Sequence, residues 1–347
     1  MADRQPGAAA ARILPLLPLT QDTLRGIAII VAGYTVISAA DAAVKWALPE
    51  VGVAVAMIWR GVFGMLAIAL LVRGRGLAPV RKPLLALRSL LHCVVTVAFY
   101  MAWFNAFPLG ASYAVNAAAP LIMTLLAIPL LGEKVGWRRW TSTCVGFAGV
   151  MIILQPGGEL WRWEAAMLLA GAATLGLTRI WTRVLAATDT PQTIAFWLLA
   201  AHVPVGFLLL PVFPPLGPLV PRWDIFLCLA FLGMANGFAH LLFSRAFAIA
   251  PVSALAPYEY TTLLWGGVLG FLIWAEVPAW NTVAGAVVVI AAGLYNLHRE
   301  QVRRREDRAA MVREDRAAMV REDRAVKVRE DRAAAGRGDR AAAEGPR

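Results

Sequence analysis

PLGASYAVNAAAPLIMTLLAIPLLGEKVGW, residues 108–137, aligns without a gap on PVSALAPYEYTTLLWGGVLGFLIWAEVPAW, residues 251–280. Three landmarks recur after 143 positions: Pro108, Glu133 and Trp137 correspond to Pro251, Glu276 and Trp280. A constant spacing between landmarks indicates an internal repeat. The alternative is that apolar helices resemble one another by composition alone. These two stretches decide the fold because they predict a chain built from two related halves.

The composition places the chain in a lipid bilayer. Apolar residues make up 59% of it and charged residues only 16%, whereas soluble domains have about 45–50% and about 25%. The net charge of +11 comes from Lys and Arg in short loops and in the C-terminal tail, where membrane topology explains it. We therefore expect no nucleic-acid partner. The three cysteines are far apart within apolar stretches, which excludes a disulfide framework or a metal site, and no cofactor is expected.

Ten apolar stretches are each about long enough to cross a bilayer as a helix. They are residues Leu24–Leu48, Gly52–Val72, Leu84–Phe107, Ala111–Leu131, Trp137–Leu154, Trp163–Leu185, Thr193–Phe213, Trp223–Ala246, Val252–Trp274 and Trp280–His298. Pro120, Pro204 and Pro257 lie inside spans and predict kinks or local breaks. The predicted fold class is an all-α polytopic membrane protein with ten transmembrane helices.

Two halves of five spans each must enter the membrane from opposite sides. We expect a first repeat over residues 24–155 and a second, inverted repeat over residues 163–298. Residues 1–23 are expected to form a cytoplasmic segment without a cleavage site, and residues 299–347 a charged, low-complexity tail. Inverted repeats around a midplane site are the architecture of many secondary transporters.

Basic residues predict the orientation. They cluster before the first span, in every second loop and in the tail, with Arg25, Arg73, Arg75, Lys134 and Arg138 as examples. Positive loops face the cytoplasm, so both termini are expected inside. Gly233 with Gly237, and Gly266 with Gly270, have a spacing that lets helix backbones approach closely. We interpret these pairs as packing within the chain, with a homodimer face as the alternative.

The landmark residues also resemble a known family. The run Pro108–Gly110, Asn116, Pro120, Leu131–Glu133, Gly136–Trp137 and Gly146–Val150 is similar to the EamA-type repeat of the drug/metabolite transporter superfamily, and a second copy follows over Ala256–Tyr260, Ala275–Pro278 and Ala291–Gly293. The second copy departs from the pattern at Ala275, where the family usually has glycine. The resemblance implies a ten-helix carrier in the bacterial inner membrane that moves a small molecule. Relatives export amino acids or drugs, or take up S-adenosylmethionine or riboflavin; we favour export, with uptake as the alternative.

Charged residues deep in the spans are the candidates for gating, because a buried ionisable group costs about 2.5 kcal/mol or more in lipid. By depth, Asp41 is expected to pair with Arg60, with Lys45 as a competing partner of Asp41, and Arg179 is expected to pair with Glu259. We interpret these two pairs as ionic latches on either side of a substrate site. The alternative is two permanent structural pairs.

Polar and aromatic residues at middle depth are the candidates for the substrate path: Tyr34, Ser38, Tyr100, Trp103, Asn116, Thr178, Asn236, His240, Tyr258 and Tyr260. Their chemistry suits a ring or a zwitterion, and helix packing is the alternative role for each. Proton coupling is expected only through Asp41, Glu259 or His240, and exchange without protons stays open. The sequence lacks the nucleophile, base or metal motifs of a membrane enzyme, and a scaffold without transport has no need of an inverted repeat.

Overall fold

The computed structural model describes residues 21–119, 121–122, 137–250, 252–299 and 302. Its elements are all helical, and none of the residues in these ranges forms a strand. They are α1 (Gln21–Val51), α2 (Val53–Leu71), α3 (Lys82–Phe104), α4 (Leu109–Asn116), α6 (Trp137–Leu154), α7 (Trp163–Leu185), α8 (Pro191–Leu209), α9 (Trp223–Ile249), α10 (Val252–Leu255), the 3-10 helix η1 (Ala256–Tyr260), α11 (Thr261–Trp274) and a last helix, Trp280–Arg299.

Seven of the described helices are long and apolar enough to cross a membrane: α1, α2, α3, α7, α8, α9 and Trp280–Arg299. A shorter apolar helix, Trp140–Leu154, lies within α6. The chain is therefore an all-helical membrane protein with several spanning helices. Glu133, the end of the expected fourth span, most of the N-terminal segment and nearly all of the tail lie outside the described residues.

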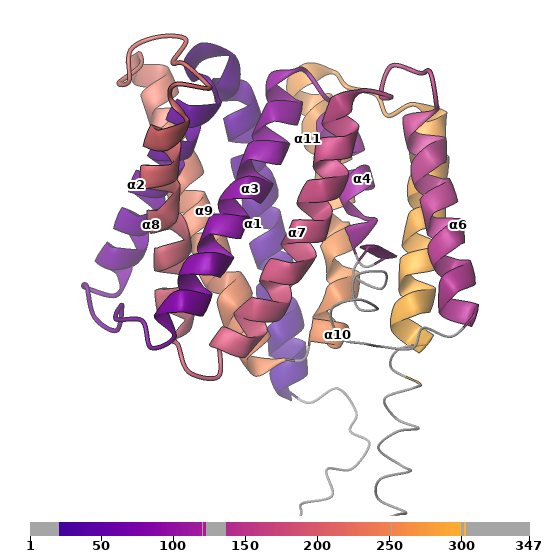
Figure 1. The fold of residues 1–347 in the computed structure, drawn as a ribbon, viewed down its shortest axis with the longest axis horizontal. Coiled ribbons are helices and arrows are strands. Elements are labelled where there is room, and N and C mark those ends of the chain that lie inside the picture. The colour runs from indigo at the N-terminus through magenta and orange to yellow at the C-terminus, as the bar shows by residue number, and fades with distance from the viewer. Residues whose placement is uncertain (1–20, 120, 123–136, 251, 300–301, 303–347) are drawn as a thin grey trace, which may run out of the picture. The chain divides into compact units, whose positions relative to one another are not determined.

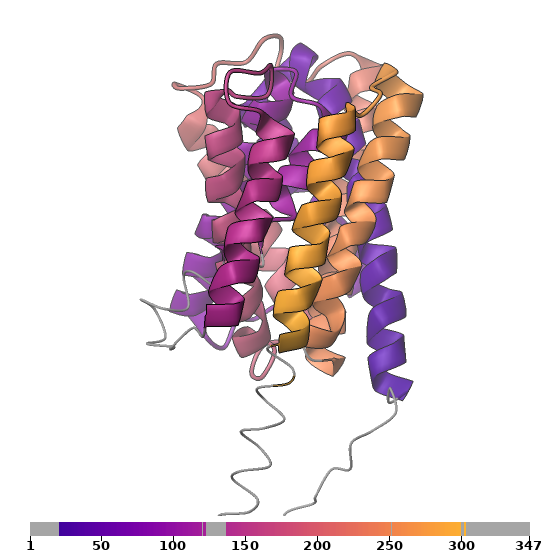
Figure 2. The same ribbon diagram turned by 90° about the vertical axis from the view of Figure 1, so that its right-hand side faces the viewer.

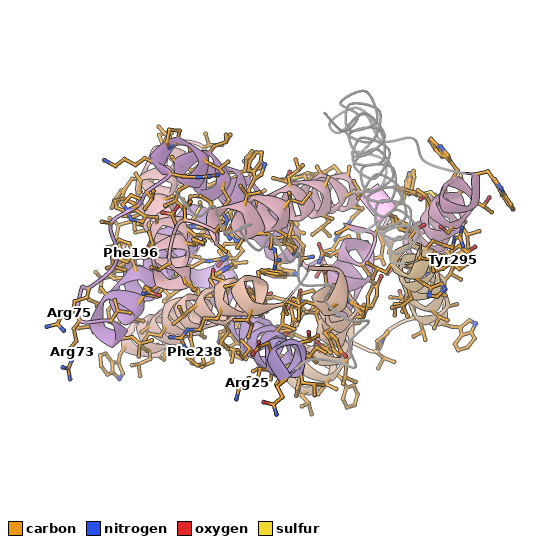
Figure 3. The ribbon with its side chains drawn as sticks, turned by 90° about the horizontal axis from the view of Figure 1, so that it is seen from below. Arg25, Arg73, Arg75, Phe196, Phe238 and Tyr295 are labelled. Atoms are coloured by element: carbon orange, nitrogen blue, oxygen red, sulfur yellow. The ribbon has the colours of Figure 1, made fainter. Side chains whose placement is uncertain are left out.

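The outer surface of the bundle carries many large apolar side chains, and its interior combines an apolar core with buried polar groups. Large apolar side chains such as Leu70, Leu208 and Leu272 are exposed, while Ser112, His202 and Asn236 are completely buried. Arg25, Arg73 and Arg75 lie at the rim of the bundle when it is seen from below (Figure 3). An apolar outer surface of this kind matches hydrocarbon, and the buried polar groups need partners inside the protein.

Helices of residues 24–155 pack in pairs against helices of residues 163–298, as the two views in Figures 1 and 2 show. α1 lies along α9, α3 lies along α7, α2 lies along α8, and α4 contacts α11. α6 and the helix Trp280–Arg299 lie side by side (Figure 2), and a Cβ added to Gly149 would lie 2.9 Å from the Gly285 carbonyl oxygen. Each of these contacts joins an element of residues 24–155 to one of residues 163–298.

Glycines of both pairs identified in the sequence lie at close contacts between helices of the same chain. Cβ atoms added to Gly233 and Gly237 would lie 3.1 Å from the Gly64 nitrogen and 2.7 Å from its carbonyl oxygen, so α9 meets α2 almost backbone to backbone. On α11, an added Cβ at Gly266 would lie 3.1 Å from the Gly110 Cα. Both pairs are thus covered by intramolecular contacts.

The prolines act differently in the two described spans that contain them. Pro257 lies in η1, so the ninth expected span is divided into α10, a 3-10 turn and α11. α8 continues through Pro204 as an unbroken helix, so no break forms there. Pro120 lies outside the described residues. The break at Pro257 has a structural consequence, because it places Glu259 in η1, on the inner side of the bundle.

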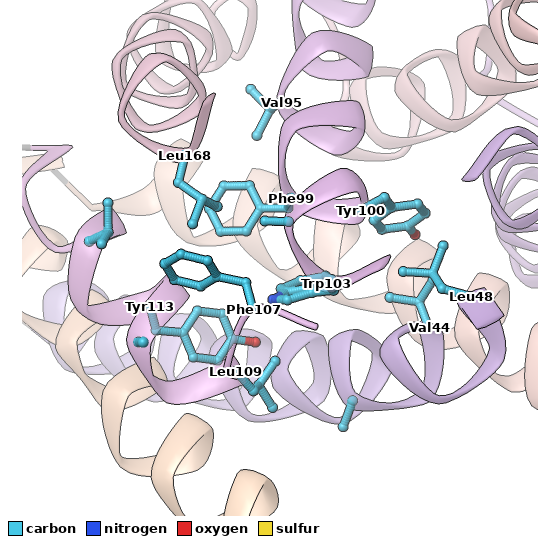
Figure 4. Close-up of a cluster of buried hydrophobic side chains, with 14 of the residues drawn as sticks. Val44, Leu48, Val95, Phe99, Tyr100, Trp103, Phe107, Leu109, Tyr113 and Leu168 are labelled. Atoms are coloured by element: carbon cyan, nitrogen blue, oxygen red, sulfur yellow. The ribbon is translucent and has the colours of Figure 1, made fainter. Parts of the chain in front are cut away.

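The core of the bundle is rich in aromatic side chains. Phe99 and Trp103 of α3, Phe107 and Tyr113 lie one against another between α1, α4 and α7, with Leu168 above them (Figure 4). The ring centroids of Phe99 and Trp103 are 5.5 Å apart, and those of Trp103 and Tyr113 are 6.5 Å apart. This aromatic layer forms one wall of the cavity described below.

Candidate functional site

A cavity of about 900 Å³, a volume that includes its opening to solvent, lies between the helices. Helices of both expected repeats line it: α1, α2, α3 and α4 belong to the first, and α7, α9, η1 and α11 belong to the second. Side chains of both halves therefore share one cavity.

Ten of the residues selected from the sequence line this cavity: Tyr34, Asp41, Arg60, Tyr100, Trp103, Asn116, Thr178, Arg179, His240 and Glu259. The other five do not. Ser38 and Asn236 are buried in helix contacts, and Asn236 donates a hydrogen bond of 2.9 Å to the Leu232 carbonyl oxygen. Tyr258 and Tyr260 pack against apolar clusters, and Lys45 lies outside the lining. Whether the lining residues touch a substrate stays a prediction.

Arg179 and Glu259 form an ion pair across the cavity wall, between α7 and η1. The Glu259 side chain is 4% exposed, and its second oxygen accepts a hydrogen bond of 3.3 Å from the Asn116 amide. Both carboxylate oxygens of this buried group therefore have partners. A buried carboxylate is tolerated when it is paired and hydrogen-bonded in this way.

Asp41 and Arg60 line the same cavity but do not form the ion pair expected from their depth. The Asp41 carboxylate accepts a hydrogen bond of 2.7 Å from the Tyr113 hydroxyl. The Arg60 guanidinium donates a long hydrogen bond of 3.4 Å to the Tyr100 hydroxyl and lies 3.2 Å from His240 Nε2. Equal depth in the membrane does not fix the direction in which two side chains point. Asp41 and Arg60 each contact uncharged side chains instead of each other.

Lys45, the expected competitor for Asp41, pairs with Glu276 instead. Glu276 follows α11 and also accepts a hydrogen bond of 3.0 Å from the Leu109 backbone nitrogen at the start of α4. The Lys45 ammonium lies 4.6 Å from the centre of the Trp274 ring. One carboxylate thus ties together α1, α4 and the end of α11. Figure 1 shows these three ends at the top of the bundle.

The selection from the sequence missed one face of α3. Arg88, His92 and Thr96 line the cavity together with Tyr100, and the four are spaced by four residues. That spacing places them in a row on one side of a helix, which is the signal that could have identified them. Tyr113, Thr182 and Thr262 were also missed.

Three histidines lie close together beside Arg60. The ring centroids of His92 and His240 are 4.9 Å apart, and those of His92 and His202 are 5.9 Å apart. His202 is fully buried, 2.9 Å from the Thr96 hydroxyl and 2.8 Å from the Leu198 carbonyl oxygen. Among the described residues, no group of three His, Cys, Asp or Glu side chains is arranged to hold a metal ion. The cluster is instead a set of hydrogen-bonding groups at the cavity wall.

The sequence model of the EamA-like transporter family matches residues 24–155 and again residues 162–297. A riboflavin transporter of Rhizobium johnstonii is 29% identical over 265 residues, which are 76% of this chain and 85% of that protein. An S-adenosylmethionine uptake transporter of Rickettsia prowazekii is 27% identical over 56% of this chain and 65% of its own length. A pseudopaline exporter of Pseudomonas aeruginosa is 24% identical over 77% of this chain and 94% of its own length.

A solved structure has a similar fold, with a TM-score of 0.55 at 16% sequence identity. The superposition covers 82% of this chain and 99% of the other. At this identity the likeness concerns the fold alone. The two family matches cover most of the chain, and the relatives that resemble it over most of their length are transporters. With two copies of the family's repeat, the chain is a membrane transporter of the EamA-like family, and helices of both copies line its cavity.

Proposed function

We propose that this chain is a secondary carrier that moves a small metabolite across the bacterial inner membrane by alternating access. The observation that carries the proposal is the cavity, which is lined by charged, polar and aromatic side chains from helices of both matched repeats. The proposed substrate path consists of the ten lining residues that were selected from the sequence. It also includes Arg88, His92 and Thr96 on one face of α3. Charged side chains in this path are costly at membrane depth, so their presence supports a functional role.

We infer ten membrane-spanning helices arranged as two inverted repeats, over residues 24–155 and 163–298. The packing of equivalent glycines supports this. Gly33 and Gly171 are 138 positions apart; a Cβ on Gly33 of α1 would lie 2.7 Å from the Phe243 ring of α9, and one on Gly171 of α7 would lie 3.6 Å from the Phe99 ring of α3. Thus α1 meets α9 much as α7 meets α3.

A second reciprocal contact joins α2 and α8. A Cβ on Gly61 would lie 2.8 Å from Val203 Cγ2, and one on Gly206 would lie 2.6 Å from Ile58 Cγ1. Gly61 and Gly206 are 145 positions apart, and so are Ile58 and Val203. Each helix therefore presents to the other the same glycine and β-branched residue, as expected when a two-fold axis relates them.

The orientation we propose has both termini and the tail in the cytoplasm. Arg25 near the start of α1, Arg73 and Arg75 after α2, and Lys82 at the start of α3 belong to the same end of the antiparallel helices. Positive charge at one end of the spanning helices supports a cytoplasmic location for that end. The Lys45–Glu276 pair belongs to the opposite, outer end.

We propose two ionic latches in this mechanism. Arg179–Glu259 lies in the cavity wall, and Lys45–Glu276 ties α1 to the end of α11 at the outer end. The second latch replaces the Asp41–Arg60 pair expected from the sequence. In alternating access one latch opens while the other is closed, so each pair must gain or lose its partner during the cycle.

Export is the direction we propose first. The match to the pseudopaline exporter spans 94% of that protein, whereas the match to the S-adenosylmethionine uptake transporter spans 65%. Uptake of a metabolite is the second candidate, supported by the uptake relatives themselves. Flux measured in right-side-out and in everted vesicles separates the two, because an exporter loads everted vesicles.

The test of the carrier role is flux into proteoliposomes. A panel of labelled amino acids, nucleoside-like metabolites and vitamins is offered with and without a pH gradient, and one class is expected to cross. Stimulation by the gradient that disappears in Asp41→Asn, Glu259→Gln or His240→Gln identifies the proton-carrying residue. A scaffold moves nothing, and an enzyme returns a chemically changed compound; either outcome would falsify the carrier.

A further inference from the structure

Two arginines in the cavity have no acidic partner. Arg60 of α2 and Arg88 of α3 are each 5% exposed, and both line the cavity. Arg88 Nε donates a hydrogen bond of 3.1 Å to the Thr182 hydroxyl, and its Nη1 has no partner among the described residues. Arg60 hydrogen-bonds to Tyr100 and lies beside His240, and its buried Nε has no hydrogen-bonding partner in the part of the chain that the structure describes. Buried donors without partners are rare in native proteins.

The charges of the lining do not balance. Among the described residues that line it are three guanidinium groups, of Arg60, Arg88 and Arg179, and two carboxylates, of Asp41 and Glu259. Glu259 is paired with Arg179, and Asp41 is hydrogen-bonded to Tyr113. A cationic group held at membrane depth beside neutral partners is destabilising unless a counter-charge or water reaches it. The lining therefore has an unmatched positive charge facing the cavity.

The two arginines lie on either side of the histidine pair. Arg60 lies 3.2 Å from His240 Nε2, the rings of His240 and His92 are 4.9 Å apart, and His92 is one helical turn from Arg88. The row brings nitrogen groups of α2, α9 and α3 to the same stretch of the cavity lining. Arg is the residue that recognises carboxylate and phosphate groups with two parallel hydrogen bonds.

Next to these donors the cavity is aromatic. Tyr100 and Trp103 have ring centroids 6.1 Å apart, and Tyr34 and Phe243 approach to 4.9 Å on the opposite side. All four rings line the cavity. Aromatic walls favour a flat apolar or conjugated ligand.

We propose that the cavity binds an organic anion, namely an aromatic molecule carrying a carboxylate or a phosphate, with its oxyanion between Arg60 and Arg88 and its ring against Tyr100 and Trp103. This proposal rests on the carrier role and adds a substrate class to it. It distinguishes ligands that share a ring but differ in charge. The shared chemistry is an oxyanion on an aromatic body; carboxylate and phosphate are separate arms of the test.

The experiment uses matched pairs of ligands with the full chain. Riboflavin 5′-phosphate is compared with riboflavin, and indole-3-acetate with indole-3-acetamide, by equilibrium binding to the purified protein in nanodiscs and by flux into proteoliposomes. We expect at least one anion to bind about tenfold or more tightly than its neutral partner. The pair that responds identifies phosphate or carboxylate as the recognised group.

Variants then connect the preference to the two arginines. Arg88→Gln and Arg60→Gln are expected to abolish the preference for the anion, while Arg88→Lys retains part of it because the charge remains without the fork of donors. Arg75→Gln, in an exposed loop, is the control for loss of one positive charge. Size-exclusion profiles confirm that each variant is folded.

Two outcomes overturn the proposal. Neutral ligands that bind as well as their anions refute it, and so does a preference that survives in both glutamine variants. Binding is measured separately from flux, so a failure of the proposed carrier role does not change the conclusion about anion binding. If the anion binds but nothing crosses the membrane, the anion site stands and transport is refuted.

Discussion

The side-chain amide of Asn116 donates a hydrogen bond of 3.3 Å to the carboxylate of Glu259, and the two residues are 143 positions apart. This is the same spacing that separates Pro108 from Pro251 and Trp137 from Trp280. Residues that occupy equivalent positions in two halves related by a two-fold axis meet only close to that axis. The contact therefore places the proposed axis at the cavity wall, where an amide of one half faces a carboxylate of the other.

Replacing Asn116 by aspartate tests this contact. Asn116→Asp places a second carboxylate against Glu259, and two carboxyls at this distance cannot both be ionised at low cost. Repulsion between the two carboxylates breaks the contact between α4 and η1, so we expect flux to fall by about tenfold relative to the wild type. The check is flux into proteoliposomes at neutral pH. Asn116→Ser, which removes the amide without adding charge, should lose less flux than Asn116→Asp.

The outer latch gives a second prediction. Lys45→Met leaves Glu276 with only the Leu109 backbone nitrogen as a hydrogen-bonding partner, so α1 is no longer tied to α11 by charge. Loss of one member of a buried ion pair is strongly destabilising. We therefore expect the equilibrium between the closed and the open conformation of this end of the bundle to shift toward the open one by about tenfold or more.

The measurement is labelling of Ser112→Cys by a membrane-impermeant maleimide in a background without the three native cysteines. Ser112 is completely buried below the start of α4, so its labelling reports opening. The rate should rise in Lys45→Met and stay unchanged in Lys82→Met, an exposed lysine at the other end of the bundle. Equal rates in all three proteins would show that the pair does not hold the outer end closed.

Helix positions could be predicted closely from the sequence, because hydrophobicity and tryptophans mark the membrane boundary. α6 and α7 begin and end at the expected residues, Trp137–Leu154 and Trp163–Leu185. α4 begins two residues before the expected Ala111, but it ends at Asn116, and a turn at Ala117 and Ala118 interrupts the expected fourth span. What depth along a helix does not give is the direction of a side chain around it. That is why Asp41 and Arg60, correctly expected to be at similar depth, face different partners.

The missed site residues have a related cause. Arg88 lies only a few residues after Arg81 and Lys82, so in the sequence it belongs with the positive charges that flank a span. The structure buries it, because α3 begins at Lys82 and turns Arg88 inward. In the sequence, Glu276 is a landmark of the repeat at the end of a span. Its pairing with Lys45, 231 positions away, depends on tertiary packing that no local pattern encodes.

Close packing of α2 on α8 gives a third prediction. A methyl group at Gly61 would lie 2.8 Å from the Leu199 carbonyl oxygen and 2.8 Å from Val203 Cγ2, too close without a backbone shift. We expect Gly61→Ala to destabilise the protein by about 1–3 kcal/mol, seen as a lower melting temperature in detergent. Gly267→Ala is the matched control: it makes the same substitution in a helix, with no atom within 4 Å of the new Cβ. A control as unstable as Gly61→Ala would contradict the packing argument.

The turn after α11 gives a fourth prediction. Ala275 has a φ of 54°, in the left-handed region that favours glycine, and the hydrogen bond of 3.1 Å from the Glu276 nitrogen to the Gly270 carbonyl oxygen closes the turn behind it. A residue with a Cβ costs about 1–2 kcal/mol in this conformation. Ala275→Gly should therefore raise the melting temperature and leave flux unchanged, while Ala275→Val should lower it. Thermal unfolding of the three proteins decides the matter, and a loss of stability in the glycine variant is the contrary result.

The buried pair of the cavity wall gives the last prediction. Arg179→Gln leaves the Glu259 carboxylate, 4% exposed, with Asn116 as its remaining hydrogen-bonding partner. An uncompensated buried charge costs about 3–5 kcal/mol, whereas removing both charges costs far less. The double variant Arg179→Gln with Glu259→Gln should therefore be more stable than Arg179→Gln alone. If the pair is also a latch, the double variant regains stability but not flux. If the double variant recovers both stability and flux, Arg179–Glu259 is a structural pair and not a latch. If the double variant is less stable than Arg179→Gln, an unpaired buried charge does not explain the loss of stability.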